Sequence, residues 1–154
     1  MVLTIEFPVK FNFALQTVEL NSESWIDYQL LEDTAMINNW YQGLAHELNF
    51  EPDDIPLGGE RFVTPRTVSW ITINPKHNYT YSRRTLRPKP LEQHPTLMTI
   101  FHFIQSVYGH AFNGVLCNHY ANGDDHISFH TDDEPALGHN PTIVSISLQH
   151  PECQ

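Results

Sequence analysis

The spacing of apolar positions along the chain predicts two helices. Over residues 34–48 the apolar side chains recur at helical intervals and lie on one face, and Asp33 or Thr34 is the candidate N-cap. A second stripe of the same period runs over residues 96–108, and Gly109 is suited to end it. Both segments are therefore expected to be amphipathic helices that pack one face against a core.

Short segments rich in β-branched and aromatic residues predict strands. These segments are residues 68–73, 78–82, 114–120, 126–130 and 142–148. Residues 51–60 (EPDDIPLGGE) have the Pro, Gly and Asp content of a loop. Strands that follow helices in this order predict an α+β domain whose second half is a β-sandwich or jelly roll.

The composition indicates a single globular domain. The chain has 154 residues, of which 40% are hydrophobic and 12% aromatic, enough for one core and short for two domains. No apolar run approaches the ~18 residues that a membrane span needs, and the first residues lack the charged and apolar regions of a signal peptide. Two cysteines suit a reducing compartment. We expect a cytoplasmic protein, or a nuclear one in a eukaryote, without a membrane partner.

The charges are distributed unevenly. A net charge of −10 argues against generic nucleic-acid binding, because phosphate contacts need Lys and Arg. Seven of the eight basic residues nevertheless lie between Arg61 and Lys89, with acidic regions on both sides. This local basic segment is either a solvated face or a contact surface for phosphates, and charge alone does not decide between the two.

One pair of residues has the spacing of metal ligands. His130 and Asp132 are separated by one residue, which at the end of a strand directs both side chains to one face. A third imidazole would complete the facial triad of a non-haem Fe(II) oxygenase. Asn118 and Tyr120 alternate on the preceding strand, where an amide and a hydroxyl can hold a dicarboxylate ligand. A surface turn for the first pair and ordinary strand packing for the second are the alternative interpretations.

The residues around these pairs form a longer pattern. Residues 118–134 read N-x-Y-x-x-G-x-D-x-I-x-x-H-x-D-D-E, and residues 141–148 read P-x-I-x-S-x-S-L. Upstream, residues 64–83 contain a P-R…Y-x-Y-S segment, and residues 91–100 read LEQHPTLMTI. Over residues 60–148 the chain resembles the AlkB family of Fe(II)/2-oxoglutarate-dependent dioxygenases, in particular its eukaryotic-type homologues with H-x-D-D-E.

The resemblance implies a role for each matching residue. The implied iron ligands are His130 and Asp132, and the implied contacts to 2-oxoglutarate are Asn118 and Tyr120. The residues implied to line the pocket for a damaged base are Trp70, Tyr79 and Tyr81. The acceptors implied for the exocyclic amine of that base are Glu134 and Asp133. The candidates for phosphate contacts are Arg66, Arg83, Arg84 and Arg87. Ordinary strand packing is the alternative for the two tyrosines.

The resemblance also implies a fold, an activity and a division of the chain. The fold would be α+β, with N-terminal helices and strands that lead into a partial double-stranded β-helix, or jelly roll. The activity would be oxidative demethylation of N-alkylated bases in DNA or RNA, with Fe(II) as metal and 2-oxoglutarate and O2 as cosubstrates. Residues 1–154 would form one domain, made of an N-terminal extension (1–60), a nucleotide-recognition region (61–111) and a metal-dyad core (112–148).

Two features of the AlkB family have no counterpart in the sequence. The family draws a second histidine ligand and 2-oxoglutarate-binding arginines from beyond the S-x-S-L segment, whereas no Lys or Arg follows Lys89 here. His126, His139 and His150 do not take a ligand position of the family. We therefore expect a C-terminally truncated member: a gene fragment or frameshift product, a chain that pairs with a separately encoded C-terminal fragment, or a shortened homologue without oxidase activity. A catalytically dead nucleic-acid-binding or interaction module is the rival to the enzyme.

Overall fold

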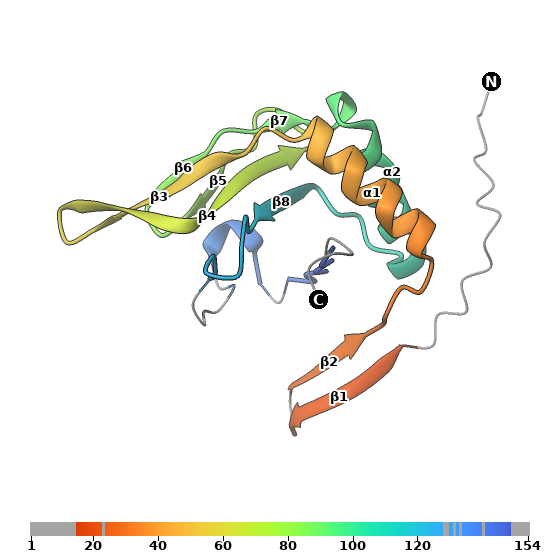
Figure 1. Cartoon of the computed structure of the whole chain (residues 1–154). Coiled ribbons are helices and arrows are strands. Elements are labelled where there is room, and N and C mark those ends of the chain that lie inside the picture. The colour runs from red at the N-terminus through yellow and green to blue at the C-terminus, as the bar shows by residue number, and fades with distance from the viewer. Residues whose placement is uncertain are drawn as a thin grey trace. The chain divides into compact units, whose positions relative to one another are not determined.

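The computed structural model describes residues 15–22, 24–127, 130, 132, 134–139 and 141–148. Its helices and strands are, in chain order, β1 (Gln16–Asn21), β2 (Ser24–Tyr28), α1 (Thr34–Glu47), β3 (Glu51–Leu57), β4 (Glu60–Thr72), β5 (Tyr79–Tyr81), β6 (Arg84–Leu86), β7 (Lys89–Pro90), α2 (Pro95–Tyr108) and β8 (Gly114–His119), with short 3-10 turns at Leu91–Gln93 and Pro135–Leu137. Figure 1 shows their course. Residues 1–37 and 38–154 form two compact units, each described by itself.

The first unit contains a β-hairpin and the start of helix α1. Strands β1 and β2 pair antiparallel, and the hydroxyl of Thr17 donates to Asp27 (2.6 Å) across the pair. At the start of α1 the backbone N–H of Met36 donates to the carboxylate of Asp33 (2.9 Å). This bond satisfies one of the unpaired amides of the first helical turn. The predicted N-cap at Asp33 is confirmed.

Both predicted helices are present, and α1 and α2 agree with the expected bounds to within one residue. Gly109 follows α2 with a φ of 65°, a left-handed conformation that glycine adopts without steric cost. The carboxylate of Glu47, at the end of α1, accepts the backbone N–H of Thr96 (3.0 Å) in the first turn of α2. One helix therefore caps the other. In the described part of the chain, no helix combines the length and apolar character needed to cross a membrane.

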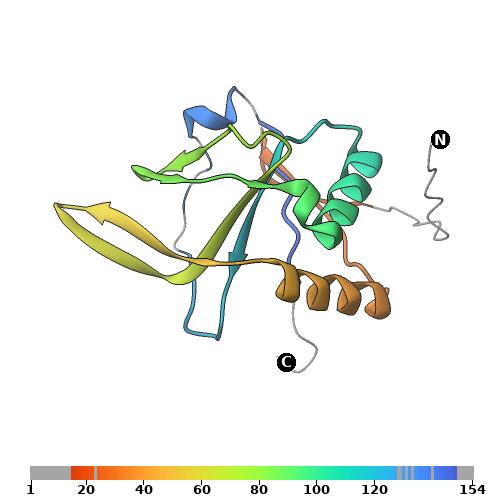
Figure 2. The ribbon, with the colours of Figure 1, turned by 90° about the horizontal axis from the view of Figure 1, so that it is seen from above.

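Strand β4 is the centre of the main sheet, as can be followed in Figure 2. Strands β3 (antiparallel) and β7 (parallel) pair with one edge of β4, and β8 pairs antiparallel with the other. The edges follow from the register, because Val68 has partners in both β3 and β8, and Ile71 has partners in both β7 and β8. Strands β5 and β6 form a separate hairpin whose turn residues, Ser82 and Arg83, both have positive φ.

Residues 51–60 are not the loop that their composition predicts. They supply β3 and the Gly58-Gly59 turn that leads into β4, with φ of 62° and 91° at the two glycines. Pro52 and Pro56 are compatible with a strand here because β3 lies at the end of the sheet order, where a missing N–H need not remove a ladder bond. The loop prediction was wrong because composition does not show the pairing of residues 51–57 with β4, nor the burial of Asp53 within that strand.

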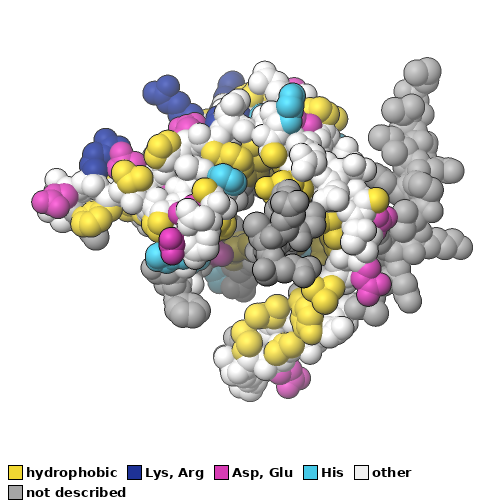
Figure 3. All heavy atoms as spheres, in the orientation of Figure 1, with side chains coloured by type: hydrophobic (Ala, Val, Ile, Leu, Met, Phe, Trp, Pro, Cys, Tyr) yellow, Lys and Arg dark blue, Asp and Glu magenta, His cyan; other side chains and the backbone are white. Residues whose placement is uncertain are grey.

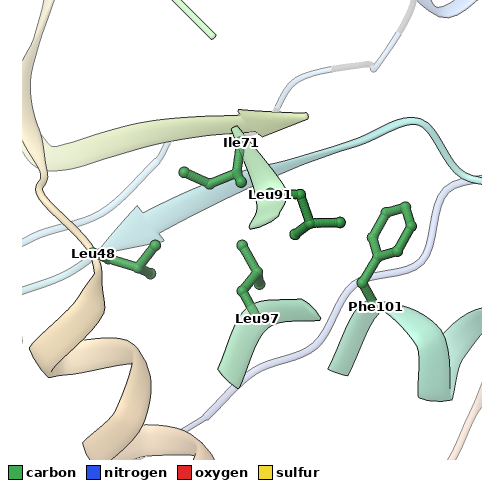
Figure 4. Packing of buried hydrophobic residues seen from close by; sticks show 5 residues of the cluster. All are labelled: Leu48, Ile71, Leu91, Leu97 and Phe101. Carbon is green, nitrogen blue, oxygen red and sulfur yellow. The ribbon is translucent and has the colours of Figure 1, made fainter. Parts of the chain in front are cut away.

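Side chains alternate across β4 and β8 and build apolar clusters on opposite faces of the sheet. The helix-side cluster consists of Leu48, Ile71, Leu91, Leu97 and Phe101, which Figure 4 shows converging. The aromatic-side cluster consists of Val68, Tyr79, Tyr81 and Leu86, with Trp70, Leu116 and Leu137 packed against it. The sheet thus separates one face covered by helices from one face built around aromatic rings.

The C-terminal part of the fold differs from the prediction. Neither residues 126–127 nor residues 142–148 are in a strand, although strands were expected at 126–130 and 142–148. A strand persists only where a neighbouring backbone supplies hydrogen bonds, and no described strand pairs with these segments. The other three predicted strands are confirmed as parts of β4, β5 and β8. The α+β class is confirmed, and the jelly roll is partial.

Candidate active site

The three aromatic side chains expected in a base pocket lie together. The rings of Trp70 and Tyr79 are stacked, with centroids 5.0 Å apart and planes at 27°. The rings of Tyr79 and Tyr81 have centroids 5.5 Å apart and planes at 33°. Both tyrosines are buried, and Leu137, from the segment after the metal pair, packs against the same cluster. This arrangement is compatible with both interpretations of the tyrosines, ordinary strand packing and a base pocket.

Trp70 is fixed at both ends of its indole. Its Nε1–H donates to the backbone carbonyl of His77 (2.8 Å), and its six-membered ring lies over Gly114 of β8. A Cβ atom on Gly114 would lie 2.2 Å from Cη2 of Trp70, far inside van der Waals contact. Gly114 was not predicted as a site residue, although a glycine inside a strand is a known sign of close approach.

Carboxylates from the metal-dyad region act on the aromatic cluster. Burial, together with the negative charges of Glu134 and Asp132, raises the pKa of Tyr79 to about 12. The Oε2 atom of Glu134 is buried and has no hydrogen-bond partner among the described residues. A buried acceptor without a partner is costly, and a ligand with an N–H donor would satisfy it. The structure thus brings together two predicted groups of residues that are far apart in sequence, while Asp133 lies outside the described residues.

A buried carboxylate that the sequence did not reveal connects four strands. The Oδ2 atom of Asp53 accepts hydrogen bonds from Nε (3.1 Å) and Nη2 (3.0 Å) of Arg66. Its Oδ1 atom accepts hydrogen bonds from the hydroxyl of Tyr81 and from Nη1 of Arg84 (3.0 Å). Burial lowers the pKa of Arg66, but the nearby Tyr120 and the hydrogen bonds and charge of Asp53 outweigh this effect and leave that pKa raised.

The four arginines expected at phosphates divide into two pairs. The side chains of Arg66 and Arg84 are only 5% and 13% exposed, and both form ion pairs with Asp53. Arg83, in the turn between β5 and β6, and Arg87 are exposed. The structure does not leave Arg66 accessible for the expected phosphate contact, because its guanidinium is buried against the carboxylate of Asp53. Arg84 also pairs with Asp53 but is partly exposed and lines a groove.

The two residues expected at 2-oxoglutarate lie at the end of β8. Asn118 is exposed and pairs in register with Val68 of β4. Tyr120 follows the last residue of the strand and is 42% exposed. The next turn is closed by Asp125, whose carboxylate accepts the backbone N–H of Ala121 (2.6 Å).

His130 and Asp132 are close enough to bind one metal ion. Nε2 of His130 lies 3.4 Å from Oδ1 of Asp132, and each side chain is about half exposed, at 48% and 47%. An imidazole and a carboxylate are two of the three donors of a 2-His-1-carboxylate iron site, so the donor chemistry fits. No group of three or more His, Cys, Asp or Glu suited to a metal occurs among the described residues. Nδ1 of His126 donates a hydrogen bond to the backbone carbonyl of Asp124 (2.9 Å) in its own turn, and His150 lies outside the described residues.

A groove lies beside the β3–β4 and β5–β6 hairpins. It has a volume of about 670 Å³, and its charged lining residues are Arg61, Arg83 and Arg84 together with the acids Glu51 and Asp54. Figure 3 shows the Lys and Arg side chains gathered over these hairpins. The basic segment noted in the sequence is therefore partly a surface feature, although Arg66 is buried.

Comparison with known proteins identifies the family. Residues 25–152 match the model of the 2OG-Fe(II) oxygenase superfamily. The human alpha-ketoglutarate-dependent dioxygenase alkB homolog 3 is 36% identical over 133 residues, or 85% of this chain and 40% of that protein. Its bovine counterpart is 45% identical over 84 residues, or 54% of this chain and 28% of that protein. The human DNA oxidative demethylase ALKBH2 is 45% identical over 70 residues, or 46% of this chain and 26% of that protein.

The chain spans at most 40% of the length of these curated relatives. The family model, in contrast, covers most of the chain, including both the aromatic residues and the His130–Asp132 pair. The chain therefore belongs to the 2OG-Fe(II) oxygenase superfamily as an AlkB-like member, in a family whose metal is Fe(II) and whose cosubstrates are 2-oxoglutarate and O2.

Proposed function

We propose that this chain carries the base-binding and metal-binding part of an enzyme that demethylates N-alkylated bases of DNA or RNA, using Fe(II), 2-oxoglutarate and O2. The observation that carries the proposal is that the aromatic cluster lies near the carboxylates of the metal-dyad region, with Leu137 of that region packed against it. Trp70 and Tyr79 are stacked, and the charges of Glu134 and Asp132 act on Tyr79. The names of the similar proteins, an alpha-ketoglutarate-dependent dioxygenase and a DNA oxidative demethylase, support the same activity.

The aromatic cluster suits a base that carries a positive charge. Methylation at N1 of adenine or N3 of cytosine makes the base cationic, and a cation over an aromatic face gains about 2 kcal/mol when both are desolvated. A base that leaves the stack regains about 1–3 kcal/mol on an aromatic side chain. The unpartnered Oε2 of Glu134 would accept the exocyclic amine of that base. Leu137, which packs against the cluster, would have to move aside as the base enters.

The end of β8 and the segment after it would hold the metal and cosubstrate. His130 and Asp132 would be two Fe(II) ligands, since their donor atoms lie 3.4 Å apart and are accessible. Bound Fe(II) supplies the activation of O2, with 2-oxoglutarate as the co-reductant. Asn118 and Tyr120 would orient 2-oxoglutarate through an amide and a hydroxyl. The remaining ligand would come from outside the described residues, and a separately encoded C-terminal fragment is one source.

Phosphate contacts are assigned to the two exposed arginines, Arg83 and Arg87. Each contact of this kind adds affinity without base specificity and makes binding weaker as salt rises. The aromatic cluster would then select the base, and the arginines would hold the strand.

The proposal is tested by incubating the chain with Fe(II), 2-oxoglutarate, O2 and a single-stranded oligonucleotide that carries one 1-methyladenine. We expect succinate and formaldehyde in equal amounts, and their loss in His130→Ala. His139→Ala, which changes an exposed histidine of the same segment, is the matched control and should keep the activity. A parallel reaction contains the C-terminal half of the similar human alkB homolog 3 as a source of the remaining ligand.

A second function is a nucleic-acid-binding module without turnover. The observation in its favour is that no three-residue metal group occurs among the described residues. Preferential binding of the methylated oligonucleotide without succinate in either reaction would establish this function and exclude the enzyme. Absence of both binding preference and succinate would contradict both functions.

A further inference from the structure

The turn that follows β4 holds the indole of Trp70 by its edge. Residues 73–77 form this turn, and the backbone carbonyl of His77 accepts the Nε1–H of Trp70 (2.8 Å). A backbone acceptor is held only as firmly as the backbone that carries it. Whatever fixes the backbone of His77 therefore also fixes the edge of the indole.

Asn74 makes four hydrogen bonds in this turn. Its backbone N–H donates to Oγ1 of Thr72 (3.2 Å), and its backbone carbonyl accepts the N–H of His77 (2.9 Å). Its side-chain Oδ1 accepts the backbone N–H of Lys76 (3.1 Å), a local bond by which asparagine stabilises turns. The amide then presents its Nδ2 as a donor to Nε2 of His77 (2.9 Å). Both the backbone and the ring of His77 are thus attached to Asn74.

The turn is also anchored to β8, beside the glycine over which the indole lies. The hydroxyl of Thr72, which is 1% exposed, donates to the backbone carbonyl of Asn113 (2.7 Å), and the N–H of Ile73 donates to the same carbonyl (3.2 Å). Gly114 is the next residue, and a Cβ on it would lie 2.2 Å from the indole. The backbone beside the indole and the carbonyl at its edge therefore belong to one hydrogen-bonded unit.

We propose that Asn74 is a positioning residue that holds the indole of Trp70 in its base-binding orientation through the backbone carbonyl of His77. Trp70 stacks on Tyr79, with ring centroids 5.0 Å apart, so a rotation of the indole changes the aromatic surface that a base would meet. The inference rests on the proposed function for what that surface binds, whereas the restraint on the indole is a property of the turn. Asn74 does not belong to the aromatic-side cluster and acts through Trp70.

The first experiment measures the restraint without any ligand. The hydrogen-exchange rate of each indole N–H is followed by NMR in the chain with isotope-labelled tryptophan, and Trp70→Phe identifies the signal of Trp70. Exchange of a bonded N–H requires local opening, and loss of one hydrogen bond shifts such an equilibrium by about threefold to tenfold. Exchange at Trp70 should be about threefold faster or more in Asn74→Ala. Exchange at Trp25, which is 63% exposed, should not change.

Conservative variants separate the bonds of Asn74 from a general loosening of the turn. Asn74→Asp keeps an acceptor for the N–H of Lys76 and presents an oxygen to Nε2 of His77, which donates in its other tautomer, so exchange at Trp70 should stay near the native rate. Asn74→Ser keeps only the acceptor for Lys76 and should give an intermediate rate. Asn122→Ala is the matched control, because the Oδ1 of Asn122 accepts a backbone N–H (2.8 Å) in a different turn.

Two outcomes of this experiment overturn the proposal. The first is an unchanged rate at Trp70 in Asn74→Ala, or in Asn74→Ser if the Asn74→Ala chain does not fold. The second is an equally large rise in Asn122→Ala, which would show that any weakened turn releases the indole.

The second experiment measures the consequence for recognition. Dissociation constants are determined for a single-stranded oligonucleotide with one 1-methyladenine and for the same strand with adenine, and their ratio gives the preference. Asn74→Ala should lower the preference about threefold or more, with affinity for the unmethylated strand nearly unchanged, since phosphate contacts are untouched. In a Trp70→Phe background no indole N–H remains to be held, so Asn74→Ala should lower the preference no further. An equal loss in both backgrounds would show that Asn74 does not act through Trp70 and overturns the proposal.

The failure of this inference and that of the proposed function are distinguishable. If the native chain shows no preference for the methylated strand, the proposed function fails, and the exchange rates at Trp70 alone decide on the restraint. If the preference exists and is unchanged by Asn74→Ala, the positioning role of Asn74 is excluded while the proposed function stands.

Discussion

The two faces of the β4–β8 sheet are stabilised by different forces. The helix-side cluster consists of Leu, Ile and Phe side chains that need only contact and exclusion of water. The aromatic-side cluster includes two buried tyrosines, and one of them reaches the Asp53 ion pairs. Each buried polar group on this face needs a hydrogen-bond partner in a suitable direction. The first face therefore contributes mainly to the stability of the fold, and the second fixes the positions of the candidate site residues.

The largest expected effect concerns the helix-side cluster. Ile71 is completely buried between β7 and β8, so Ile71→Ala should lower the free energy of unfolding by about 2–5 kcal/mol. Urea denaturation measures this loss. Below the unfolding transition, the preference for a methylated strand should persist. A loss under about 1 kcal/mol, or a preference that disappears in the folded variant, would show that the two faces are not separate in this way.

A smaller effect is expected where β8 supports Trp70. Gly114→Ala places a Cβ where the indole now lies, and such overpacking costs about 1–3 kcal/mol. Because the indole must shift, the variant should also bind the methylated strand more weakly. Gly123→Ala is the control, since a Cβ there would meet no atom within 4 Å. Equal stability and binding for both variants would contradict the close packing of Trp70 on Gly114.

Alkaline pH should weaken the packing of the two buried tyrosines on the aromatic face. The pKa of Tyr79 is raised to about 12 and that of Tyr81 is raised further, with burial as the first cause in both cases. The folded state therefore retains protons that the unfolded chain releases above pH 10, and the free energy of unfolding falls as pH rises from 10 towards 12. Tyr79→Phe combined with Tyr81→Phe should flatten this decline in urea titrations at pH 9, 10 and 11. An identical decline in the double variant would place the titrating groups elsewhere.

The smallest effect separates charge from backbone conformation in the β5–β6 turn. Arg83 has a φ of 64°, a conformation that costs a non-glycine residue about 1–2 kcal/mol and that glycine tolerates. After the entropy cost of glycine, Arg83→Gly should stabilise the fold by about 0.5 kcal/mol while lowering the salt slope of oligonucleotide binding by about one. Arg87→Gly removes the same charge and should bring no stability gain. An unchanged salt slope for both would remove these arginines from the phosphate contacts.

Prediction from the sequence succeeded where the determining interactions are local. The helices follow from apolar periodicity and from caps at Asp33 and Gly109, which act within one turn. The burial of Asp53 could not be predicted, because its partners lie 13, 28 and 31 residues away. The same long-range pairing turned Arg66 and Arg84 inward. Residues 142–148 have the composition of a strand, but composition does not supply the partner strand that would pair with them.

The candidate site residues also divide into those that a sequence motif identifies and those that only the folded structure identifies. Trp70, Tyr79 and Tyr81 were selected by resemblance to a family motif, and the structure places their rings in contact. Asp53 and Gly114 belong to no such motif, since their roles depend on which side chain lies opposite in the folded sheet. The burial of Asp53 could have been inferred from its inward position on an edge strand. That inference requires β3 to be recognised as a strand first.

The most direct measurement is the ratio of dissociation constants for a single-stranded oligonucleotide with one 1-methyladenine and for the same strand with adenine. Fluorescence anisotropy at fixed salt provides both values. Contact of a cationic base with the aromatic cluster and Glu134 predicts at least about tenfold tighter binding of the methylated strand, equivalent to about 1.4 kcal/mol. Trp70→Ala and Glu134→Gln should each reduce this ratio. Equal affinities for the two strands, or a preference that survives both substitutions, would contradict the assignment of this cluster as the base-binding site.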